Sequence, residues 1–357
     1  MALAFACSAV ALQVRSSLRS FAFSLWVGAF VAFALAYPAF FLTWGGFELK
    51  QLLVPLIQII MFGMGTTLSA KDFGRVLAMP KAVLVGIGLQ FSVMPLVGFG
   101  LATAFGFQPE VAAGVVLIGS CPGGVASNVM TFISRGNVAL SVTMTACSTL
   151  VSPLMTPLMM MLLAGRMIKI DFSNMMMSIL SMVIVPIVAG LVANEVLRML
   201  RLRGPWLDRL LSLVAMAAIC YIIAIITALS RDELLGIGVA LAAAAVLHNG
   251  IGYVLGYVGG ALSGLDESTR RTMAIEVGLQ NGGMASGLAV NVLKSSNAAL
   301  ASAIFGPWMN ISGSVLASYW RGRPVANHPR NGDGSVFENV SQNDPGTVST
   351  LENVRDV

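Results

Sequence analysis

Long apolar runs recur along this chain, and they constrain its fold more than any other feature of the sequence. A helix needs about 20 apolar residues to cross roughly 30 Å of hydrocarbon, and stretches of that length fill most of the 357 residues. The sequence therefore predicts an all-α polytopic membrane protein with ten transmembrane helices. We expect the spans near residues 20–43, 51–69, 82–106, 111–134, 137–165, 175–197, 206–229, 234–262, 272–293 and 297–320.

Too few charged residues are present to cover a surface in water. They make up 10% of the chain, whereas soluble domains carry roughly 25%. This excludes a soluble enzyme, a nucleic-acid-binding domain and a disordered scaffold. The net charge of +5 does not indicate nucleic acid as a partner, because the basic residues are scattered singly between apolar runs. Four cysteines without a C-x-x-C pair indicate neither a zinc site nor a redox pair.

Lysine and arginine residues are distributed unevenly between the two predicted sides of the membrane. With the amino terminus inside, 16 of the 21 basic residues fall on that side. The positive-inside rule expects such a bias in cytoplasmic segments. It supports the count of ten spans and predicts that both termini face the cytoplasm or the equivalent compartment. The basic residues on the opposite side are Lys50, Arg166, Lys169, Arg231 and Lys294.

Two end segments fall outside the predicted bundle. In the first of these, residues 1–19, the apolar run covers residues 1–14 and is too short to span, and the arginines follow it, which argues against a secretory signal. No acidic residue precedes Glu48, so a remnant of an organelle transit peptide is an alternative. Residues 322–357 are polar and rich in Asn, Ser, Asp, Gly and Pro, and we predict a disordered tail.

An internal repeat divides the bundle into residues 20–165 and 166–321. A shift of 159 residues aligns 123–129 with 282–288 and places Gln90 opposite Asn249. Each half holds five predicted helices, and because five is odd the second half must enter the membrane inverted. Gly and Pro interrupt the fourth and ninth spans at 121–124 and 280–283. Inverted repeats with discontinuous helices are typical of secondary transporters, whose binding site lies at the breaks.

Glu276 is the one acidic residue well inside a predicted span. A charged side chain there costs on the order of 2.5–3.5 kcal/mol on insertion scales. The residue lies four positions before Gln280, one turn before the second break and on the same helix face. One interpretation is a protonated glutamate that hydrogen-bonds a neighbouring helix. The position of Glu276 beside the break favours the other interpretation, in which it is a cation ligand or a proton carrier.

Oxygen donors surround the first break. Ser127 and Asn128 follow it within a turn, and Ser141 and Thr145 share one face of the next span. Individually, such side chains serve as hydrogen-bonding contacts between membrane helices. A small hard cation, however, takes carboxylate, amide, hydroxyl and carbonyl oxygens together. The set as a whole, beside two broken helices, predicts a cation site.

Three motifs make the chain similar to a known family. Residues 121–128 (CPGGVASN), 135–141 (RGNVALS) and 276–281 (EVGLQN) resemble the bile acid:sodium symporter family, and the resemblance runs from about residue 21 to 321. It implies a sodium-coupled symporter that imports an organic anion by alternating access. It also implies a panel domain of four helices and a core domain of six, in which the broken helices 4 and 9 cross.

The resemblance further implies where two sodium ions and the substrate bind. The ions would be co-transported, with no enzymatic cofactor. Val125 and Met309 stand where many relatives have Thr and some have His, so the substrate stays open between bile acids or steroids and small carboxylates or keto acids. By residue, the first sodium site would be Ser127, Asn128, Ser141, Thr145 and Glu276, the second Gln90, Glu276, Val277, Leu279 and Gln280, and the substrate site Val125, Asn281, Met309 and Asn310.

Several alternatives stay open at this point. The transporter could be coupled to protons, or the chain could be a membrane sensor that binds an organic anion without moving it. An enzyme is not expected, because the sequence has no H-E-x-x-H motif, no pair of intramembrane acids and no P-loop. We expect a monomer in the cell membrane, either plasma or inner, with the lipid bilayer as its surroundings. An organelle envelope is the alternative location.

Overall fold

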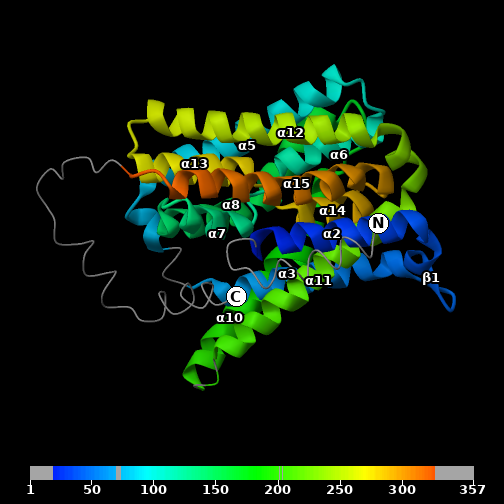
Figure 1. The fold of residues 1–357 in the computed structure, drawn as a ribbon, viewed down its shortest axis with the longest axis horizontal. Helices are drawn as coiled ribbons and strands as arrows, with labels where there is room; N and C mark the ends of the chain where they lie inside the picture. Colours follow the sequence, from blue (N-terminus) through cyan, green and yellow to red (C-terminus); the bar gives the residue numbers. More distant parts are fainter. Residues whose placement is uncertain (1–18, 70–73, 201, 203, 326–357) are drawn as a thin grey trace, which may run out of the picture.

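The computed structural model describes residues 19–69, 74–200, 202 and 204–325 (Figure 1). Of the predicted end segments, only residues 19 and 322–325 fall within this part, so the interpretations of 1–18 and 326–357 lie outside the described residues. The helices are α2 (Arg19–Ala36), α3 (Leu53–Thr67), α5 (Pro80–Ala104), α6 (Pro109–Ser120), α7 (Ala126–Ile133), α8 (Val138–Ala164), α9 (Phe172–Ile179), α10 (Val185–Met199), α11 (Pro205–Leu229), α12 (Arg231–Leu262), α13 (Glu267–Gly278), α14 (Gly282–Asn291) and α15 (Ser296–Arg321).

Seven helical segments of the described residues are long and apolar enough to cross a membrane. The prediction of a helical polytopic membrane protein is therefore confirmed. The first predicted span corresponds to α2, and the fourth and ninth to the shorter pairs α6–α7 and α13–α14. The count of ten crossings accordingly stays a prediction. The seven segments are Leu49–Thr67, Pro80–Ala104, Val138–Ala164, Phe172–Met199, Arg209–Leu229, Arg231–Leu262 and Ser296–Arg321.

The first predicted span ends too late. We expected helix to residue 43, but α2 ends at Ala36, and a 3-10 turn, η2 (Pro38–Phe41), follows. Pro38 disfavours helix in the residue before it. A short hairpin of β1 (Thr43–Trp44) and β2 (Phe47–Glu48) comes next, with Gly45 and Gly46 in its turn at φ 55° and 88°. Aromatic residues in this segment gave it the hydropathy of a span, although most of them are exposed.

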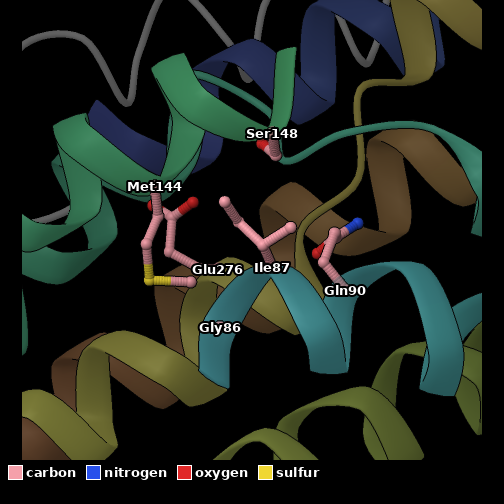
Figure 2. Close-up of a pocket in the computed structure, with 6 residues that line it drawn as sticks. All are labelled: Gly86, Ile87, Gln90, Met144, Ser148 and Glu276. Carbon is pink, nitrogen blue, oxygen red and sulfur yellow. The ribbon is translucent and has the colours of Figure 1, made fainter. Parts of the chain in front are cut away.

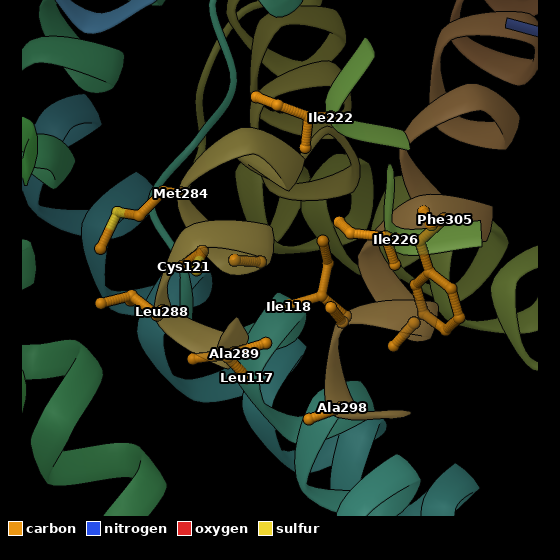
Figure 3. Close-up of a cluster of buried hydrophobic side chains, with 14 of the residues drawn as sticks. Leu117, Ile118, Cys121, Ile222, Ile226, Met284, Leu288, Ala289, Ala298 and Phe305 are labelled. Carbon is orange, nitrogen blue, oxygen red and sulfur yellow. The ribbon is translucent and has the colours of Figure 1, made fainter. Parts of the chain in front are cut away.

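Two groups of helices are visible in Figure 1. One contains α2, α3, α10 and α11, in which α3 packs on α10 and α11, and α2 packs on α11. The other contains α5, α6, α8, α12, α13 and α15. An apolar cluster joins the groups, since Ile222 and Ile226 of α11 lie with Ile118 of α6 and Phe305 of α15 (Figure 3).

Helices α3 and α10 approach each other at two glycines. A Cβ atom on Gly65 would lie 2.1 Å from the carbonyl oxygen of Ile187, and one on Gly190 would lie 2.2 Å from that of Phe62. The two backbones are therefore in direct contact. Small residues permit this packing in membrane helices, where hydrophobic driving force between helices is weak.

Candidate ion-binding site

The two predicted interruptions are non-helical in the structure, and they pair with each other. Helix α6 ends at Ser120 and α7 begins at Ala126, while α13 ends at Gly278 and α14 begins at Gly282. Residues 123 and 280 form an antiparallel β-bridge. The N–H of residue 124 donates to the carbonyl of residue 279 at 2.8 Å, and that of 281 donates to the carbonyl of 122 at 2.9 Å. Each break thus satisfies polar backbone groups of the other, as membrane depth requires.

Glu276 lies at this meeting point, two residues before α13 ends. It is 2% exposed and is the only buried acidic residue among the side chains that the structure describes. Its carboxylate accepts hydrogen bonds from Ser127 Oγ at 2.5 Å and from Thr145 Oγ1 at 3.0 Å, and a third from Ser141 Oγ. Three hydroxyl groups from α7 and α8 therefore converge on one carboxylate.

Local structure explains why these hydroxyls converge. Ser127 is in the first turn of α7, directly after the break, while Ser141 and Thr145 lie one turn apart on α8. The Asn137 side chain caps α8 by accepting from the N–H of residue 140 at 3.0 Å, so the start of that helix is fixed. Asn128 joins the group because its Oδ1 lies 2.8 Å from Ser141 Oγ, whose single hydrogen serves either this oxygen or Glu276.

This donor set suits a small cation. Each hydroxyl has one hydrogen, which it gives to an acceptor, and retains oxygen lone pairs. None of the ion pairs among the described residues includes Glu276, so no basic side chain neutralises it there. Carboxylate, hydroxyl and amide oxygens are the ligands of hard cations. Gly123 lets the first break approach the carboxylate closely, since a Cβ atom on this residue would lie only 2.9 Å from Glu276 Oε2.

The residues predicted for the second ion form an adjoining group. Gln90 of α5 donates from Nε2 to the carbonyl of Cys121 at 2.9 Å and also to Oε1 of Gln280. Gln280 in turn donates from its Nε2 to the carbonyl of Val277 at 2.7 Å. The Leu279 carbonyl accepts from the first break, as described above. These side chains and carbonyls therefore lie together, and most of their hydrogen bonds are to one another.

One narrow pocket is lined by residues from both predicted sodium sites. Figure 2 shows Gln90 and Glu276 on its wall, with Ser148 near them, although the sequence analysis did not single out Ser148. Its remaining lining residues are Gly86, Ile87 and Met144. A Cβ on Gly86 would lie 2.2 Å from the terminal methyl of Met144, so glycine makes room for this side chain in the wall of the pocket.

The four residues predicted to line the substrate site are placed differently. Met309 is buried, and its Sδ accepts from the N–H of Gln280 at 3.2 Å. Asn281 caps α14 by accepting from the N–H of residue 284 at 3.0 Å. Val125 is half-buried at the start of α7. Asn310 donates within its own helix, to the carbonyl of residue 306 at 2.9 Å. Met309 and Asn281 therefore adjoin the second break. The side chain of Asn310, in contrast, is directed along α15 by its hydrogen bond to residue 306.

Arg271 lies just before the ninth predicted span, and nothing in the sequence marked it as a buried residue. The residue lies in α13, and its side chain is 2% exposed. Its Nε donates to Glu267 Oε1 at 2.8 Å, and its Nη1 donates to the carbonyls of Ser134 and Trp320, each at 3.1 Å. The i, i+4 spacing of Glu267 and Arg271 was the available signal, but the distant carbonyl partners leave no pattern in the sequence.

A helical membrane protein with a buried carboxylate and oxygen donors at two paired helix breaks has the architecture of an ion-coupled transporter. Comparison with known proteins identifies the family. The sodium bile acid symporter family matches residues 54–237. An uncharacterized sodium-dependent transporter of Bacillus subtilis is 41% identical over 298 residues, which cover 84% of this chain and 90% of that protein. The chain belongs to the sodium bile acid symporter family.

Other relatives include eukaryotic cotransporters. A probable chloroplastic sodium/metabolite cotransporter of Arabidopsis thaliana is 34% identical over 85% of this chain and 74% of that protein. The human ileal sodium/bile acid cotransporter is 32% identical over 65% of this chain and 67% of its own length. These relatives are transporters rather than enzymes. The resemblance predicted from the three motifs is confirmed, and so is the expectation that the chain is a sodium-dependent membrane transporter.

Proposed function

We propose that this protein is a symporter that imports an organic anion together with sodium by alternating access. The observation that carries the proposal is the convergence of three hydroxyl groups on Glu276 where two broken helices meet. A carboxylate without a basic partner is stable at membrane depth when a cation balances its charge. The names of the relatives, a sodium-dependent transporter and sodium cotransporters of metabolites and bile acids, support sodium as that cation.

Two sodium ions would share Glu276. The first would be held by its carboxylate with Ser127, Asn128, Ser141 and Thr145. The second would be held by Glu276 and Gln90 with the side chain of Gln280 and the main-chain oxygens of Val277 and Leu279. The hydrogen bonds within each group support this division, because they already hold these oxygens close together.

The substrate would be an organic anion, either a bile acid or steroid or a small carboxylate such as a keto acid. Among the side chains that the structure describes, Arg271 is the only buried lysine or arginine, and it is bonded at the far end of α13. The anionic group would therefore meet the N–H groups at the starts of α7 and α14, where helix dipoles favour negative charge. Val125, Asn281, Met309 and Asn310 would line this region.

Alternating access would come from motion between the two groups of helices. The group with α2, α3, α10 and α11 would be the panel, and the group that carries both breaks would be the core. An inverted repeat of residues 20–165 and 166–321 is supported by Gln90 and Asn249, which donate to carbonyls at the ends of α6 and α13 respectively. We propose a monomer with both termini in the cytoplasm, in the cell membrane or an organelle envelope.

Reconstitution into proteoliposomes tests this function. Uptake of a labelled bile acid and of a labelled keto acid would be measured with an inward sodium gradient, a potassium gradient and a pH gradient. We expect uptake of at least one class with sodium only. Equal uptake from potassium buffer would contradict sodium coupling, and uptake driven by the pH gradient alone would indicate a proton-coupled transporter. Sodium-dependent binding without uptake of either class would indicate a sensor.

A further inference from the structure

The end of α13 is held by a side chain from another helix. The last carbonyl groups of a helix lose their partners within it. The Gly278 carbonyl accepts from Asn249 Nδ2 of α12 at 2.8 Å. Asn249 is 1% exposed, so this is a buried hydrogen bond between two helices. It supplies the partner that a buried carbonyl requires.

Two hydroxyl groups fix the orientation of the Asn249 amide. Ser312 of α15 donates to Asn249 Oδ1. A serine hydroxyl has only one hydrogen, and Ser312 gives it to Asn249 Oδ1, which is closer than the Met309 carbonyl at 3.2 Å. Tyr253, whose hydroxyl lies 3.1 Å from Ser312 Oγ and 3.5 Å from the same carbonyl, is then the donor in its contact with Ser312. The hydrogen bonds therefore run in one direction, from Tyr253 through Ser312 and Asn249 to Gly278. We name Asn249, Tyr253 and Ser312 the Gly278 clamp.

The aromatic ring of the clamp also contacts the break. A Cβ atom on Gly278 would lie 2.3 Å from Cδ1 of Tyr253. The backbone at Gly278 is therefore pressed against the ring, which only a glycine permits. Tyr253 limits the position of this backbone by contact, while Asn249 limits the direction of its carbonyl group.

Fixing the Gly278 carbonyl also limits the direction of the next carbonyl, that of Leu279. The backbone at Leu279 is extended, with φ −104° and ψ 100°, and successive groups of an extended chain face opposite sides. The Gly278 carbonyl is directed to Asn249 of α12. The carbonyl of Val277 instead meets Gln280 Nε2 at 2.7 Å, and that of Leu279 meets the first break at 2.8 Å.

We propose that the Gly278 clamp sets the affinity of the second sodium site by fixing the direction of the Leu279 carbonyl and by holding the end of α13, which carries the Val277 carbonyl, in place. This inference rests on the proposed function, in which those carbonyls are sodium ligands. Asn249, Tyr253 and Ser312 are positioning residues, because they act through Gly278. Gln90, which occupies the matching position in the first half, bonds the first break directly and belongs to the ion site itself.

The test measures sodium-dependent thermal stabilisation of the purified full chain, with sodium chloride as the probe and choline chloride as the reference. The variants are Asn249→Ala, Ser312→Ala, Ser312→Thr and Tyr253→Phe. Ser302→Ala is the matched control, because it removes a buried hydroxyl contact of 2.7 Å with Ser286, between α14 and α15 and outside the clamp. Half-saturating sodium for uptake, with the substrate class found by reconstitution, is a second measurement.

We expect Asn249→Ala and Ser312→Ala to raise the half-saturating sodium concentration by about three- to tenfold, as the loss of one buried hydrogen bond implies. Ser312→Thr keeps the hydroxyl and should restore most of the affinity. The effects of Asn249→Ala and Ser312→Ala should be less than additive, because both act through one carbonyl. Tyr253→Phe keeps the ring and should have a smaller effect than Asn249→Ala.

Wild-type protein without any sodium-dependent stabilisation would contradict the proposed function itself. If wild type responds to sodium and the Asn249 and Ser312 variants keep its half-saturating concentration, the clamp proposal alone is wrong. The same holds if Ser302→Ala shifts that concentration as much as they do. Should Asn249→Ala fail to fold, the Ser312→Ala and Ser312→Thr pair decides the matter, because these changes are smaller.

Discussion

At the scale of single residues, the charge of Glu276 should matter more to the site than its size. Its two carboxylate oxygens accept from three hydroxyls on two other helices. Hydrogen bonds to a charged group contribute about 1.5–3 kcal/mol each. A neutral side chain of the same length would keep one acceptor oxygen but lose both the charge and much of this bonding.

Glu276→Gln should therefore abolish sodium-dependent stabilisation and reduce sodium-driven uptake at least about 100-fold, which corresponds to roughly 2.7 kcal/mol. Glu195→Gln, at an exposed position of α10, is the control and should behave as wild type. The measurement is initial uptake into proteoliposomes at saturating sodium. Wild-type sodium dependence in Glu276→Gln would remove the basis for both ion sites.

Gly123 tests how closely the first break approaches the carboxylate. Alanine there would place a methyl group 2.9 Å from Glu276 Oε2, so it should displace the carboxylate and raise half-saturating sodium. Gly282→Ala is the matched change at the second break, where the nearest atom to the added methyl lies 3.6 Å away. We expect near wild-type sodium dependence for Gly282→Ala. Equal effects of the two substitutions would show that proximity to Glu276 is not the cause.

The residues of the site differ in how far the sequence predicts them. Glu276 is evident because a lone acid in an apolar span is costly, and Ser141 and Thr145 follow from helical spacing. Asn249 and Ser312 are different. Small polar residues are frequent in membrane helices, and what gives these two a role is a partner on another helix, which spacing along one helix does not indicate.

At the scale of helices, Arg271 joins the ends of three elements. Its guanidinium bonds Glu267 within α13, the carbonyl of Ser134 directly after α7, and the carbonyl of Trp320 at the end of α15. The planar guanidinium holds five donors in a fixed geometry, which lysine does not reproduce. Helices α7 and α13, which carry Ser127 and Glu276, are therefore held together at a distance from the site.

Arg271→Met should lower the free energy of unfolding by about 3 kcal/mol or more, because it removes the basic partner of Glu267 and the donor to the carbonyls at two helix ends. Arg271→Lys should fall between this variant and wild type. Arg321→Lys, at an exposed position near the end of α15, is the control. Thermal unfolding of the detergent-solubilised protein measures the effect. An unchanged midpoint in Arg271→Met would show that its bonds do not stabilise the fold.

The sequence predicts the long helices well because each needs an unbroken apolar run, and α5, α8 and α12 begin within a few residues of the expected positions. It predicts the positions of the breaks as well, from Gly and Pro. The pairing of the two breaks is not evident from the sequence, because it depends on backbone hydrogen bonds between residues far apart along the chain. The end of α2 was misplaced, since aromatic residues in a hairpin have the same hydropathy as those in a helix.

At the scale of the whole molecule, the excess of basic residues on one side gives a testable topology. Lys169 follows α8 and Arg198 lies in the last turn of α10, and the predicted spans place them on opposite sides of the membrane. In intact cells, a membrane-impermeant maleimide should label Lys169→Cys but not Arg198→Cys. Permeabilised cells should show labelling of both, and wild type measures the background. Labelling of both in intact cells would contradict the predicted topology.

The backbone pairing of the two breaks has a consequence for transport kinetics. The residues at 124 and 279 share a hydrogen bond of 2.8 Å, and those at 122 and 281 share another of 2.9 Å. An ion that orders one break thereby orders the other, and the next ion meets a site already arranged. Sodium binding should then be cooperative, with a sigmoidal dependence of uptake rate on sodium and a Hill coefficient above one.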